Sequence, residues 1–116
     1  MQIDLLPLPR GPRRGATERL REELQALARG HAEFLSHSEK SWASVTFAGT
    51  RHRLDIAFAG EDAVEAAENF IAYLPEHEFT IPRQLVADAA VTAVDHRIGP
   101  APRMEVRIEL LLLDED

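Results

Sequence analysis

The stretch LVADAAVTAVDHRIGPAPRMEVRIELLLL, residues 85–113, holds the clearest pattern in the chain. From Met104 to Leu112, apolar residues alternate with charged ones for most of the length, which is typical of a strand with one buried face. Residues 85–97 also have the composition of an extended strand, and Gly99-Pro100-Ala101-Pro102 supplies turn residues between the two segments. We therefore predict a long antiparallel hairpin.

The connector also predicts how these two strands pair. A turn centred between Pro100 and Ala101 sets Ala93 opposite Ile108 on the buried face of the hairpin. One alternative stays open at the start of the first strand. Because a proline favours the first turn of a helix, residues 83–90 could form a helical turn instead.

Two other segments have the spacing of amphipathic helices. In residues 17–39, with Thr17 as the N-cap, one stripe recurs at steps of three and four: Leu20, Leu24, Leu27, His31 and Phe34. Gly30 lies off this stripe, so the helix either tolerates it or bends there. Residues 61–74 have the spacing of a second helix, which is more apolar than the first and which Pro75 ends.

A second hairpin is expected between the two helices, over residues 42–58. Gly49-Thr50 suits a two-residue type II′ turn, because that turn requires glycine at its first position. This turn sets Val45 opposite Leu54 and leaves one face of the hairpin apolar.

The predicted order of elements is helix, two strands, helix, two strands. This order favours an α+β fold, a two-layer sandwich in which two helices cover one face of an antiparallel sheet of at least four strands. Residues 16–116 are enough for one domain. Residues 1–15, rich in proline and glycine, are expected to form an N-terminal arm that is flexible or adds Gln2–Leu6 as an edge strand. Whether the two hairpins join one sheet is left open by the pattern.

Composition excludes several kinds of chemistry. The chain has no cysteine, which rules out disulfides, thiolate metal sites and cysteine nucleophiles. No apolar run approaches the roughly 20 residues that cross a bilayer, so we expect a cytoplasmic protein without membrane contact. The net charge of −7 disfavours nucleic acid as a partner. A nucleic-acid accessory role would rest on the arm alone, on Arg10, Arg13 and Arg14.

A metal or acid–base site is the main chemical hypothesis. Its candidate ligands are carboxylates and imidazoles in two short segments: Glu76, His77 and Glu78 with Asp95 and His96. Their spacing matches no metal motif, and there is no nucleophile elbow or phosphate-binding loop. The competing interpretation is a solvated acidic turn after a helix, and no cofactor is expected.

Two features indicate protein contact. The last strand becomes apolar on both faces at its end, where Leu111 and Leu113 are left over on the face away from the predicted core. The stripe Leu20, Leu24, Leu27, His31 and Phe34 could serve a partner helix as well as a sheet. We therefore predict a non-enzymatic protein-interaction or homo-oligomeric module whose partner is a second copy, in a homodimer, or another protein. The alternative is a small-molecule-binding or metal-binding domain, enzymatic in one version, that uses the Glu76–Glu78 and Asp95–His96 segments.

Overall fold

The predicted fold class is confirmed by a computed structural model, which describes the backbone of residues 10–115 and the side chains of residues 15–115. The elements are α1 (Arg10–Leu27), β1 (Glu33–Ala43), β2 (Ala48–Ala59), α2 (Glu61–Tyr73), the 3₁₀ helix η2 (Leu74–Glu76), β3 (Gln84–Arg97) and β4 (Arg103–Asp114). All four strands form one antiparallel sheet in the order β1-β2-β4-β3. Both hairpins therefore share a sheet. The proposed edge strand at residues 2–6 lies outside the described residues.

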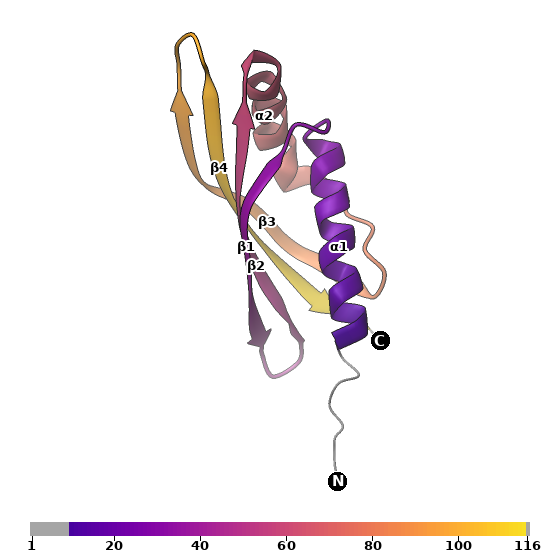
Figure 1. Ribbon diagram of the computed structural model, residues 1–116. Coiled ribbons are helices and arrows are strands. Elements are labelled where there is room, and N and C mark those ends of the chain that lie inside the picture. The colour runs from indigo at the N-terminus through magenta and orange to yellow at the C-terminus, as the bar shows by residue number, and fades with distance from the viewer. Residues whose placement is uncertain (1–9, 116) are drawn as a thin grey trace.

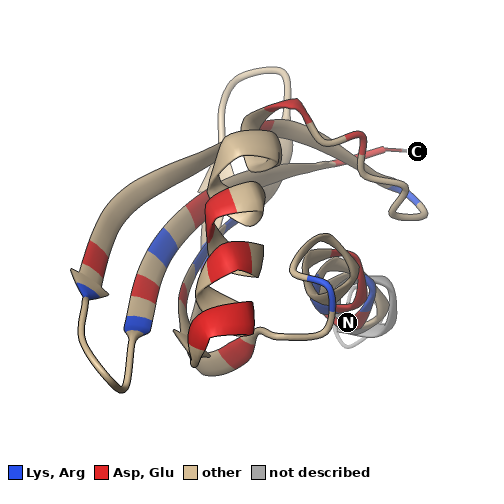
Figure 2. Cartoon of the chain, turned by 90° about the horizontal axis from the view of Figure 1, so that it is seen from above, with Lys and Arg blue, Asp and Glu red and all other residues tan. Residues whose placement is uncertain are grey.

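Both helices cover the same face of this sheet, which curves around them (Figures 1 and 2). The central strands supply most of the core, because every second residue of β4 from Met104 to Leu112 is buried against the helices. Leu54, Ile56 and Phe58 of β2 and Phe70 of α2 complete it. Neither helix, over the residues described, has the length and apolar character needed to span a membrane.

The first helix starts and ends earlier than predicted. It begins at Arg10, so Thr17 lies inside it, and it ends at Leu27. The Gly30 and Arg29 amides donate to the carbonyls of Gln25 and Ala26, and both residues have positive φ. This is a Schellman cap, which stops a helix. The last two residues of the predicted helical stripe lie beyond this cap, His31 in a turn and Phe34 in β1.

The first hairpin has a different turn and register from those predicted. Ala43 pairs with Ala48, and Leu54 pairs with His37, so Val45 lies in the loop. The side chain of Ser44 accepts hydrogen bonds from the amides of Thr46 and Phe47, which fixes a turn at residues 44–47. The predicted turn at Gly49-Thr50 is therefore wrong, because these two residues lie inside β2.

The second hairpin is correct in its strands and wrong in its register by one or more residues. Residues 84–90 are strand, which settles the open alternative. The turn is centred on Pro100, since Arg97 pairs with Arg103, and irregularities occur after Val86 and Val91. As a result Ala93 pairs with Arg107 and not with Ile108, on the face away from the helices. Each irregularity inserts an unpaired residue and changes the face to which the next residues of β3 point.

Candidate functional site

The face of the sheet that the helices leave uncovered is apolar at one end. There Trp42, Gly49, Leu113 and Leu85 pair across all four strands in one row. Leu85 is 49% exposed and Trp42 is partly exposed. Leu113 is only 8% exposed although it lies on the face away from the helices.

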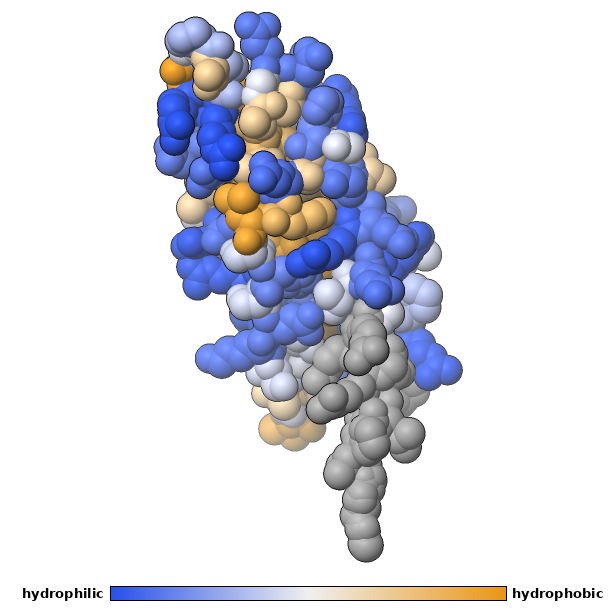
Figure 3. Space-filling view, viewed as in Figure 1, coloured by the Kyte–Doolittle hydropathy of each residue, from blue (hydrophilic) through white to orange (hydrophobic). Residues whose placement is uncertain are grey.

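The loop beside this row adds the most exposed apolar side chains of the first hairpin. Val45 is fully exposed and Phe47 is 51% exposed, and the loop begins at Ser44, two residues after Trp42. We call Trp42, Val45, Phe47, Leu85, Leu111 and Leu113 the apolar end. Figure 3 shows apolar surface at the tip of this hairpin, at the bottom of the view, below a broad hydrophilic band.

The middle of the uncovered face is charged and hollowed. A hollow of about 390 Å³ is lined by Leu35, Asp55, Glu105, Arg107 and residues of β3 around Val94. The Arg107 Nε–H donates to Asp55 Oδ1 at 2.8 Å between paired positions of β2 and β4. The Arg107 guanidinium, helped by the Ser36 hydroxyl, holds the pKa of the Asp55 carboxyl below its usual value. This region therefore combines a partly exposed ion pair with the exposed apolar side chains of Leu35 and Val94.

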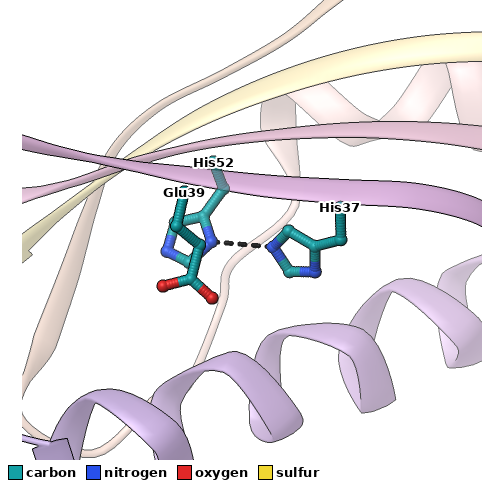
Figure 4. Close-up of side chains that lie close together, drawn as sticks. All are labelled: His37, Glu39 and His52. Carbon is teal, nitrogen blue, oxygen red and sulfur yellow. Dashed lines mark hydrogen bonds between the residues drawn. The ribbon is translucent and has the colours of Figure 1, made fainter.

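A second polar site lies on the covered face, between the sheet and α1. Glu39 of β1 pairs directly with His52 of β2, and His37 lies two residues before Glu39 on the same face of β1. Figure 4 shows the two imidazoles facing each other, with the Glu39 carboxylate beside His52. Their potential ligand atoms all lie within 4.8 Å of one another. We call these three residues the histidine cluster.

Hydrogen bonds fix the proton positions in this cluster. Arg21 Nε–H donates to His37 Nδ1 at 3.0 Å, so the proton of the neutral His37 ring is on Nε2. His37 Nε2 then donates to His52 Nδ1 at 2.9 Å. Burial lowers the pKa of His37 to about 4, with further lowering by His52 and Arg21 and a smaller opposing effect of Glu39. His37 is therefore both acceptor and donor in a chain of hydrogen bonds that runs from Arg21 to His52.

The helix contributes a second contact to the cluster. Thr17 of α1 donates its hydroxyl proton to Glu39 Oε2 at 2.8 Å. His52 is 2% exposed, whereas Glu39 is exposed, so the cluster runs from the interior to the surface. A buried imidazole, a half-buried imidazole and an oriented carboxylate are therefore combined at one point.

The metal ligands predicted from the sequence do not come together. His77 Nε2 contacts Glu23 Oε1 at 3.1 Å, while Glu76, Glu78, Asp95 and His96 are exposed. Over residues 15–115 the histidine cluster is the group in which three such ligand atoms converge. Glu76 is the last residue of the 3₁₀ helix η2, His77 and Glu78 follow it outside any helix, and His96 pairs with Met104 near the tip of the second hairpin.

The predicted interface residues divide into three groups. Leu20 and Leu24 are fully buried in the core of the chain itself, which leaves them inaccessible to a partner, and Leu27 and Phe34 pack against that core. His31 is exposed in the turn after α1. Leu111 and Leu113 do lie on the uncovered face, as their pattern indicated.

The three arginines of the nucleic-acid hypothesis can be placed only in part. The backbone of Arg10, Arg13 and Arg14 is part of α1, and their side chains lie outside the described residues.

Sequence reasoning missed the histidine cluster and most of the apolar end. His37 and Glu39 fell inside a predicted helix, where residues two apart point in different directions. On a strand the same spacing aligns them, so the pattern His37-x-Glu39 was a usable signal once β1 was known. Leu85 and Trp42 meet only through β2 and β4, which no local pattern encodes.

The elements and their arrangement define an α+β protein with a four-stranded antiparallel sheet and two helices on one face. No family model matches the sequence, and no curated protein matches it. Among solved structures, the chain is similar to one from the "Virion of native gene transfer agent (GTA) particle". The two share 14% identity with a TM-score of 0.57, over 85% of this chain and 92% of that one. At this identity the likeness shows a shared fold.

Proposed function

We propose that this protein is a non-enzymatic structural subunit that works by binding protein, and that its first partner is a second copy of itself. The observation that carries the proposal is the apolar end, where exposed Val45, Phe47 and Leu85 adjoin Trp42 and Leu113 on an uncovered sheet face. Single exposed apolar residues are normal on soluble proteins, but a contiguous group marks a contact site.

Burial of this surface supplies a driving force. Full burial of a large apolar side chain such as Phe47 is worth about 1.5–3 kcal/mol relative to exposure. In a two-fold dimer each contact occurs twice, because the same patch serves both copies. A few such side chains therefore yield enough free energy to offset part of the cost of association.

The charge distribution favours contact at this end over contact elsewhere. The exposed side of α2 carries a stripe of acidic residues, visible along the helix in Figure 2: Glu61, Asp62, Glu65 and Glu68. Two copies of a chain with net charge −7 repel each other, most strongly where such stripes approach. The six members of the apolar end carry no charge, whereas the α2 stripe carries four carboxylates, so contact through these six side chains avoids bringing the two stripes together.

The fold comparison supports a role in assembly. The similar chain belongs to a virion, and a virion is a particle built from many protein subunits. A small α+β domain whose helices cover one sheet face leaves the other face and both hairpin tips for neighbouring subunits. This arrangement fits a structural role better than a catalytic one.

Hydrogen–deuterium exchange of the full chain at low and high protein concentration tests the proposal. We expect slower exchange at high concentration in peptides that cover residues 42–49 and 111–113. Peptides from α2 serve as the internal control and should exchange equally at both concentrations. Unchanged exchange at the apolar end, or protection confined to α2, would show that copies do not meet there.

A further inference from the structure

The histidine cluster combines groups that the assembly proposal does not use. His37 and Glu39 come from β1, His52 from β2, and α1 closes the site through Thr17 and Arg21. Two imidazoles and a carboxylate are the donor set that zinc and similar borderline divalent ions accept in proteins. From this convergence we propose that His37, Glu39 and His52 bind one zinc-class transition-metal ion. The proposal is independent of self-association.

The distances suit such an ion with small movements. Zinc–nitrogen bonds of about 2.0–2.1 Å in a tetrahedral site place two ligating nitrogens about 3.3 Å apart. His37 Nε2 and His52 Nδ1 are 2.9 Å apart and share one proton. The ion replaces this shared proton but lies off the line between the two nitrogens, so the nitrogens separate by a few tenths of an ångström and both rings turn toward the ion.

The carboxylate is already oriented for coordination. Thr17 Oγ1 donates to Glu39 Oε2 at 2.8 Å, and a carboxylate that accepts one such bond can ligate through its other oxygen. Hydrogen bonds of this outer kind align metal ligands in proteins. Three protein ligands leave a fourth position for water, which makes this an open site.

Arg21 makes the proposal specific, because its present contact opposes the ion. When His37 Nε2 coordinates a metal, the proton of the neutral ring moves to Nδ1, where it faces the donating Nε–H of Arg21. Arg21 must then leave, and its positive charge also repels the ion. Loss of this side chain should therefore strengthen metal binding, which a purely structural histidine pair would not show.

Calorimetric titration measures zinc binding directly. The protein is the full chain without a polyhistidine tag, and a chelator removes any metal before the titration. We expect one Zn²⁺ per chain. Glu39→Gln and His37→Gln should each weaken binding by at least tenfold, and Arg21→Met should tighten it. His96→Gln and Glu76→Gln are matched controls, because both change exposed residues outside the cluster and should bind zinc as the natural chain does.

Cobalt supplies a second readout that does not depend on affinity alone. Co²⁺ bound by two imidazoles and a carboxylate should give visible absorption that Zn²⁺ removes and that is absent in His37→Gln. Circular dichroism of each variant shows whether it is folded. No binding of either ion, or equal binding by the folded Glu39→Gln and His37→Gln variants, would overturn the proposal and leave the cluster a hydrogen-bonded pair.

Discussion

Gly49 of β2 passes so close to Leu112 of β4 that there is no room between them for a side chain. A Cβ built on Gly49 would overlap the carbonyl oxygen of Leu112 and come within 2.9 Å of the Leu113 Cα. Gly49 has no positive φ, so space and not backbone conformation requires glycine here. This close approach lets the central strands meet at the row of Trp42 and Leu85.

The contact at Gly49 yields the first prediction. Gly49→Ala should lower the free energy of unfolding by about 1–3 kcal/mol, because the strands must separate to admit the methyl group. Urea denaturation measures the change. Gly15→Ala is the control: it lies in α1 with open space around it, so alanine should be neutral or stabilise by up to about 1 kcal/mol. Equal effects of the two substitutions would contradict the described packing.

The stripe of α1 tests which apolar residues belong to the core. Leu24→Ala should cost about 2–5 kcal/mol of unfolding free energy, because Leu24 is fully buried between helix and sheet. Leu27→Ala, at a partly exposed position on the same helix, should cost less. Both values come from chemical denaturation. A larger loss at Leu27 than at Leu24 would mean that α1 packs through a different face.

The stability of the metal-free protein should depend on pH through His37. Its pKa is about 4 when folded and 6.5 when unfolded, so between these values the unfolded state binds the extra proton. The free energy of unfolding should therefore rise with pH from about 4 to 6.5 and level off above. Burial is the largest cause of this shift, His52 and Arg21 lower the pKa further, and Glu39 opposes the shift.

The expected slope has an upper limit and a control. One proton contributes at most about 1.4 kcal/mol per pH unit, and His37 contributes less because solvent reaches it. His37→Gln should flatten the profile between pH 4 and 6.5 in chelator-containing buffer, as followed by denaturant unfolding at each pH. Parallel profiles for the two proteins would show that His37 is not held neutral by its surroundings.

Much of the fold follows from local sequence. The alternation of β4 and the ending of α2 before Pro75 were both predictable, because each depends on side chains a few residues apart. The end of α1 was not predictable, because His31 and Phe34 continue the helical spacing by coincidence. Backbone hydrogen bonds around Arg29 and Gly30 decide that end.

The sites were less predictable than the fold for a related reason. The turn at residues 44–47 depends on the Ser44 hydroxyl, and the register of β1 depends on that turn. Without the register, His37 and His52 cannot be placed together. The apolar end needs the pairing of all four strands, so only its Leu111 and Leu113 members were visible in the sequence.

Sedimentation equilibrium of the natural chain and a Val45→Ser/Phe47→Ser variant over a range of concentrations tests self-association at the apolar end most directly. We expect the mass of the natural chain to rise from one chain toward two, and the variant to stay at one. Ile98→Ser is the control, since Ile98 is 82% exposed beyond β3, at the hairpin tip opposite the β1–β2 tip in Figure 1. A natural chain that stays at one-chain mass, or a variant that associates as strongly, would contradict the account.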